Sequence, residues 1–172
     1  MIKERIEKEF NAQITREFYS AYLYLAMAGY FAQKNLNGFA NWMRVQAQEE
    51  LTHAMKFFDF ILERGGKAVL DAIDKPPADW KSPFDAFDAA YKHELFVTEN
   101  INKLVSIAIE EKDFASHNFL QWFVGEQVEE ESSVDDIRQK LKLIGDNGSM
   151  IFMLDKELAA RVFVNPTANT TE

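Results

Sequence analysis

Four long segments of this chain carry apolar residues at the spacing of an α-helix and hold very little glycine or proline. Residues 3–34, for example, contain one glycine and no proline. Apolar residues that recur every three or four positions mark one face of a helix. Signals of strand structure are absent, so the sequence predicts an all-α fold.

Turn and capping residues indicate where these helices begin and end. Asn37 is expected to cap a second helix that runs to a Gly-Gly pair at 65–66. Ser82 is expected to cap a third helix and Asp113 a fourth, which ends near residue 145. A short fifth helix is expected over about 150–162.

The connections between the helices predict their arrangement. Short turns join the first helix to the second and the third to the fourth, so each pair is antiparallel. Residues 65–82 could extend to roughly 60 Å, whereas a helix of about 27 residues is about 40 Å long. We therefore expect a four-helix bundle with one long crossover, formed by residues 1–164 as a single domain and followed by a polar tail at 165–172.

Composition excludes several classes of function. The chain has 28 acidic and 19 basic residues, a formal charge of −9, and no cysteine. Without cysteine there are no disulfides, zinc knuckles or iron–sulfur ligands. The acidic balance disfavours nucleic acid as a partner, because phosphate binding needs a basic face. The charged N-terminus lacks the apolar stretch of a signal peptide, so we expect a cytoplasmic protein.

The first helix contains one unusually apolar run. Between Phe18 and Ala32 only Ser20 and Gly29 are not apolar. This run is shorter than the roughly 20 residues that span a membrane, and charged residues flank it. Burial between subunits of a homo-oligomer explains it better than a membrane does, although a locally apolar surface is the alternative.

Polar side chains interrupt the apolar face of each long helix, and six of them are expected at one height. Each half of the chain has three of these polar residues. One lies 18 residues before an interhelical turn, and the other two lie 15 and 18 residues after that turn. All six are then roughly 22–27 Å from a bundle end. They are Glu17, Glu50 and His53 around the turn at Asn35, and Glu94, Gln127 and Glu130 around the turn at Lys112.

The two halves of the chain also match each other. A shift of 77 residues aligns Glu17 with Glu94, and Glu49 and Glu50 with Glu126 and Gln127. A duplicated pair of helices related by a pseudo-twofold axis is the simplest explanation.

Four carboxylates and one imidazole at one level inside a bundle need compensation. Each unpaired buried charge costs several kcal/mol, and like charges repel. With no Arg or Lys on the inward faces at that height, the compensation is either a cation or protonation. Oxygen and nitrogen donors in this number suit a pair of first-row ions, iron or manganese ahead of zinc. A lone Glu, or His53 alone, is more often structural, but six coincident positions favour a dinuclear metal site.

These residues resemble the ferroxidase centre of prokaryotic non-haem ferritins, in the ferritin-like di-iron carboxylate family. That family's fold is a four-helix bundle with one crossover and a short C-terminal helix. The similarity covers nearly the whole chain, and its motifs are Glu17, residues 49–54, Glu94, residues 126–131, and the shorter stretches 41–43 and 154–157.

The resemblance implies two iron sites. The first would be held by Glu17, Glu50 and His53. The second would be held by Glu94 and Glu130, with Glu50 bridging the two ions.

Further roles follow from the same resemblance. Gln127 would bind the oxygen species or a polar network beside the second site. Tyr24 or Trp122 would supply an electron, with ordinary packing as the alternative for both. A third iron position leading toward the cavity would involve Glu49, Glu126, Glu129 and Glu130.

The two halves differ in a way that bears on mechanism. A symmetric di-iron site has Glu-x-x-His in each half, whereas the second half of this chain has Gln127-x-x-Glu130. Poorer ligands predict a weaker second site, which suits iron that is substrate rather than permanent cofactor. The resemblance therefore implies a ferroxidase for iron storage and detoxification, which oxidises Fe(II) with O2 or hydrogen peroxide and stores ferric mineral.

Two implications concern haem and assembly. Haem-binding bacterioferritins have a methionine where this chain has Leu51, so no haem is expected. The family forms hollow shells of 24 subunits. A redox enzyme with fixed metals and a structural bundle with protonated carboxyls remain as alternatives.

Overall fold

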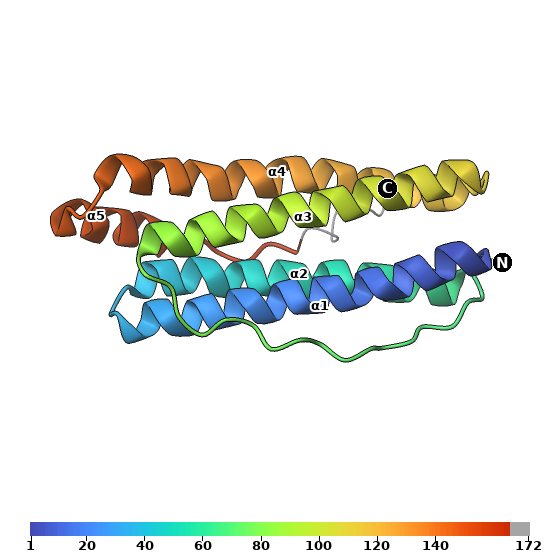
Figure 1. Ribbon diagram of the computed structural model, residues 1–172, viewed down its shortest axis with the longest axis horizontal. Coiled ribbons are helices and arrows are strands. Elements are labelled where there is room, and N and C mark those ends of the chain that lie inside the picture. The colour runs from blue at the N-terminus through green and yellow to red at the C-terminus, as the bar shows by residue number, and fades with distance from the viewer. Residues whose placement is uncertain (166–172) are drawn as a thin grey trace.

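The computed structural model describes residues 1–165, which form five α-helices and no strand. Four long helices lie side by side, and a short one lies at one end of the bundle (Figure 1). The all-α prediction is therefore confirmed. The single domain over residues 1–164 stays a prediction, and only Asn165 of the predicted tail lies within the described residues. The helices are α1 (Glu4–Gln33), α2 (Asn37–Glu63), α3 (Pro83–Glu110), α4 (Phe114–Ile144) and α5 (Gly148–Leu158).

The segment between α2 and α3 crosses the full length of the bundle alongside α1, so α2 and α3 run in the same direction (Figure 1). Asn11 on α1 holds this segment in place. Its amide nitrogen donates to the carbonyl of Lys67 at 2.9 Å, and its Oδ1 accepts from the N–H of Val69 at 2.7 Å. The predicted long crossover is thus confirmed, together with the side chain that anchors it.

Two of the predicted helix caps are confirmed. The Ser82 hydroxyl accepts from the N–H of Asp85 at 3.1 Å and caps α3. Asp113 accepts from the N–H of Ser116 at 3.2 Å and caps α4. Each cap satisfies a backbone donor that has no partner within the helix.

The predicted cap of α2 is wrong. Asn37 is the first residue of the helix, and the cap position, Leu36, makes no side-chain hydrogen bond. The free donors are satisfied from α5 instead, because Asp155 Oδ1 accepts from the N–H of Gly38 at 2.8 Å and of Phe39 at 3.0 Å. A Cβ at Gly38 would lie 1.6 Å from the carbonyl oxygen of Asp155, so glycine permits this close approach.

The fifth helix is displaced from its predicted range of 150–162. It spans Gly148–Leu158, because Asn147 caps it by accepting from the N–H of Met150 at 3.2 Å. Residues beyond Leu158 follow α2 instead of continuing the helix, since Asn41 Nδ2 on α2 donates to the carbonyl of Arg161 at 2.9 Å.

The apolar core is divided into two clusters along the bundle. The ring of Tyr24 belongs to one cluster and that of Phe57 to the other. Along each long helix, the buried polar side chains Glu17, Glu50, His53, Glu94 and Glu130 lie between residues of the two clusters. Packing above and below therefore fixes the height of the polar level. No helix among residues 1–165 is long and apolar enough to cross a membrane.

Candidate metal centre

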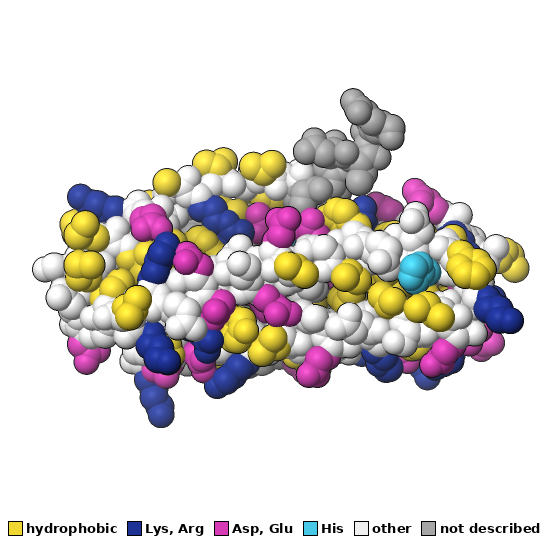
Figure 2. Space-filling model, turned by 90° about the horizontal axis from the view of Figure 1, so that it is seen from above, with side chains coloured by type: hydrophobic (Ala, Val, Ile, Leu, Met, Phe, Trp, Pro, Cys, Tyr) yellow, Lys and Arg dark blue, Asp and Glu magenta, His cyan; other side chains and the backbone are white. Residues whose placement is uncertain are grey.

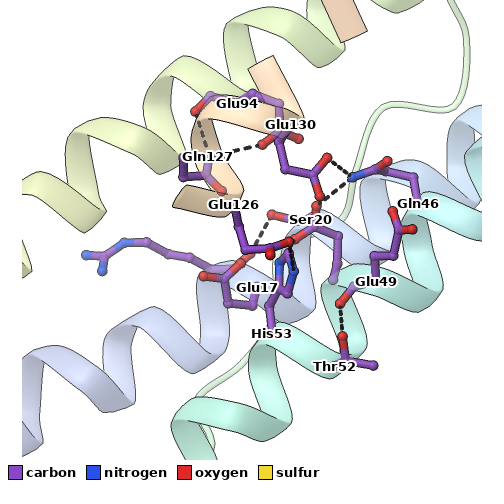
Figure 3. Close-up of polar contacts among 12 residues, drawn as sticks. Glu17, Ser20, Gln46, Glu49, Thr52, His53, Glu94, Glu126, Gln127 and Glu130 are labelled. Atoms are coloured by element: carbon purple, nitrogen blue, oxygen red, sulfur yellow. Dashed lines mark hydrogen bonds and ion pairs between the residues drawn. The ribbon is translucent and has the colours of Figure 1, made fainter. Parts of the chain in front are cut away.

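The four long helices bring together the polar side chains that interrupt their apolar faces (Figure 3). Each of the five strongest ligand candidates is at most 6% exposed. α1 contributes Glu17, α2 contributes Glu50 and His53, α3 contributes Glu94, and α4 contributes Glu130.

Two overlapping groups of ligand atoms are compact enough to hold a metal ion. Ligand atoms of Glu17, Glu50 and His53 lie within 4.8 Å of one another, and so do those of His53, Glu126 and Glu130. His53 is common to both groups. Its Nδ1 lies 3.4 Å from Glu50 Oε2, and its Nε2 lies 3.9 Å from Glu126 Oε2.

Aromatic side chains fix the orientation of His53. Its ring packs edge-on against Trp122 at 5.4 Å and Phe123 at 5.9 Å between centroids. Nε2 is buried and makes no hydrogen bond. A buried imidazole nitrogen without a partner is costly unless it binds a ligand. Trp122, predicted as a possible electron donor, therefore lies directly against a predicted iron ligand.

Glu94 belongs to neither compact group, and both of its oxygens accept hydrogen bonds. The Tyr24 hydroxyl donates to Oε1, and Gln127 Nε2 donates to Oε2 at 3.3 Å. Gln127 also donates to the hydroxyl of Thr98 at 3.2 Å. The structure therefore places Tyr24 and Gln127 on the carboxyl of Glu94, beside the predicted second site.

Two glutamines at the centre were missed by the sequence analysis as functional residues. Gln13 Nε2 donates to Glu17 Oε1 at 2.8 Å. Gln46 Nε2 donates to Glu50 Oε1 at 3.3 Å and to Glu130 Oε2 at 2.5 Å, as Figure 3 shows for Glu130. Gln46 lies one helical turn before Glu50 on the same face, and this spacing could have revealed it.

Burial keeps the carboxyl groups of the centre neutral in the absence of a metal. Loss of hydration, with Glu50 nearby, raises the pKa of Glu17 to about 8. Loss of hydration, with Glu94 nearby, raises the pKa of Glu130 to about 8. The pKa values of Glu50 and Glu94 are raised well above the ordinary range for the same reasons. A cation that binds must therefore displace protons.

An acidic pocket of about 300 Å³ opens beside the centre. On the face seen in Figure 2, acidic side chains gather near the middle of the molecule. The residues predicted for the third iron position all line this pocket, and Arg161 lines it as well, a residue that the sequence analysis missed. The acidic residues are Glu49, Glu126, Glu129 and Glu130.

Comparison with known proteins decides the family. The family model for the ferritin-like domain matches residues 7–144. The chain belongs to the ferritin family. It is 44% identical to a bacterial non-heme ferritin of Bacteroides fragilis, over 94% of this chain and 100% of that protein. It is 40% identical to a probable bacterial non-heme ferritin-like protein of Haemophilus influenzae, over 92% of this chain and 96% of that protein.

Solved structures of ferritins share the fold. A novel open pore ferritin from the hyperthermophilic archaeon Archaeoglobus fulgidus is 56% identical, with a TM-score of 0.93, over 94% of this chain and 100% of that chain. The predicted resemblance to non-haem ferritins and the predicted ferritin-like bundle are both confirmed.

Proposed function

We propose that this member of the ferritin family stores and detoxifies iron by oxidising Fe(II) to Fe(III) and retaining the product as ferric mineral. The observation that carries the proposal is the buried level of carboxyls around His53. There, ligand atoms of Glu17, Glu50 and His53 lie within 4.8 Å of one another, and so do those of His53, Glu126 and Glu130. The Nε2 of His53, which lies toward Glu126, has no hydrogen-bond partner.

Two Fe(II) ions bind at this level as substrates. Glu17, Glu50 and His53 hold the first ion. Glu94 and Glu130 hold the second, and Glu50 bridges both. To bind the second ion, Glu94 must break its hydrogen bonds with Tyr24 and Gln127. The second ion is therefore held more weakly than the first.

The oxidation needs an electron acceptor and protons. Two Fe(II) ions give up one electron each and reduce O2, with two protons, to hydrogen peroxide. With hydrogen peroxide as the acceptor, the same two electrons and two protons yield water. Anionic carboxylates favour the more highly charged Fe(III). Tyr24 donates a hydrogen bond to Glu94, and Trp122 packs against His53. Either side chain can supply a further electron from there.

The oxidised iron passes to a third position and then to the interior of a homo-oligomeric shell of 24 cytoplasmic subunits. Glu49, Glu126, Glu129 and Glu130 make the third position in the acidic pocket. Subunit contacts cover the apolar face of α1, where Tyr22 and Leu25 are 51% and 49% exposed in the single chain.

The test is oxidation by the assembled variants Glu50→Ala and His53→Ala. Stopped-flow absorbance should show loss of fast Fe(II) oxidation, while size-exclusion chromatography shows normal assembly. Glu99→Ala, which removes an exposed acid from α3, is the control and should leave the rate unchanged. Unchanged fast oxidation in Glu50→Ala or His53→Ala would overturn the assignment.

A further inference from the structure

The chain turns back after α5 and runs beside α2 (Figure 1), and this segment places an arginine in the acidic pocket. Arg161 Nη2 lies 2.5 Å from Glu49 Oε2, in a pair whose side chains are 22% and 16% exposed. The guanidinium also lies over the ring of Trp42, 4.3 Å from its centroid. One of the third-position carboxylates is therefore already paired with a cation that belongs to the protein.

Arg161 also contacts the dinuclear centre through Gln46. Its Nη1 donates to Gln46 Oε1 at 2.9 Å. Because a guanidinium only donates, the amide oxygen of Gln46 must face it, and the amide nitrogen must face away. That nitrogen donates to Glu50 and Glu130. Arg161 thus determines which end of Gln46 is presented to the centre.

The position of the guanidinium is set by the backbone around it. Asn41 Nδ2 donates to the carbonyl of Arg161 at 2.9 Å. Six residues earlier, Asp155 accepts two hydrogen bonds from the first turn of α2. These contacts hold the segment after α5 against α2, so Arg161 enters the pocket from a fixed backbone.

We propose that Arg161 is an internal counter-ion and positioning residue, which must leave Glu49 before a cation can occupy the acidic pocket and which orients Gln46 toward the centre. This inference rests on the proposed function, since it concerns transfer of iron from the same centre. The third position is consequently weaker than the first two, and it fills only when Arg161 moves.

Removing the guanidinium should strengthen the third position. In the assembled protein without oxygen, calorimetric titration with redox-inert Zn(II) should give a tight first ion, a weaker second and a still weaker third per chain. In Arg161→Gln the third ion should bind about tenfold more tightly, which corresponds to a gain of about 1.4 kcal/mol in binding free energy. Arg44→Gln, which removes an exposed arginine from α2, is the matched control and should behave as wild type.

A crystal structure of the wild-type protein soaked with Zn(II) tests the same point without a variant. Anomalous scattering should place a third ion at Glu49 with the Arg161 guanidinium displaced. An ion at Glu49 while Arg161 keeps its ion pair, or an unchanged third affinity in Arg161→Gln, would overturn this inference alone. Absence of any ion at Glu17, Glu50 and His53 would instead overturn the proposed function.

Discussion

Replacing Glu17 by glutamine should stabilise the metal-free protein at high pH much more than at pH 6. Glu17 is fully buried, accepts one hydrogen bond from Gln13, and has a second oxygen without a partner. Its pKa is about 8 in the folded chain, against an ordinary value of 4.5. The folded state therefore favours the neutral carboxyl, which a glutamine imitates in size and shape.

The sign and the size of the effect follow from these two pKa values. A carboxyl whose pKa is raised by folding contributes its full stability below about pH 4.5, and it loses that contribution as the pH rises to about 8. Between pH 6 and pH 9 the loss is about 3 kcal/mol. Glutamine does not titrate, so Glu17→Gln should gain about 3 kcal/mol over wild type between pH 6 and pH 9. In a subunit of this size that is roughly 6–12 °C in Tm.

Differential scanning calorimetry with a chelator, at one protein concentration and at both pH values, measures this gain. Glu99→Gln, an exposed carboxyl on α3, is the control, and its Tm difference from wild type should be the same at pH 6 and pH 9. With Zn(II) present the order should reverse, because wild type binds the ion more tightly and gains stability from it. A Tm difference for Glu17→Gln that is equal at pH 6 and pH 9 would refute a neutral buried carboxyl at this position.

Two further substitutions test other contacts. Tyr24→Phe removes the hydroxyl that donates to Glu94, so stopped-flow absorbance should show slower Fe(II) oxidation with the same number of ions bound; an unchanged rate would assign Tyr24 to packing alone. Gly38→Ala puts a Cβ 1.6 Å from the carbonyl oxygen of Asp155, so α5 must move away from α2 and the Tm should fall by several degrees; an unchanged Tm would contradict the close docking of α5.

Local patterns in the sequence predicted most of the bundle. Helical periodicity gave the four long helices, and short-range side-chain chemistry gave the caps at Ser82 and Asp113. The crossover followed from its length alone. Each of these features depends on residues close in the chain, which is why a single sequence was sufficient.

Contacts between distant parts of the chain were not predictable in this way. Asp155 caps α2 across 117 residues from Gly38, and Arg161 reaches Gln46 across 115 residues. Such contacts depend on where α5 docks, and periodicity carries no information on docking. At the centre, the ligand candidates could be predicted from their positions along the helices. The hydrogen bonds from Tyr24 and Gln127 to Glu94 could be identified only in the packed structure.

We propose that the chain oxidises iron at the buried carboxylate level and retains it. The most direct measurement adds many Fe(II) equivalents per chain in air and then separates the protein by size-exclusion chromatography with iron analysis of each fraction. The proposed function predicts soluble ferric iron that elutes with the assembled protein, far in excess of the ions that the centre and the third position hold. Iron that precipitates, or that stays at two or three ions per chain, would contradict storage and favour an enzyme with fixed metals.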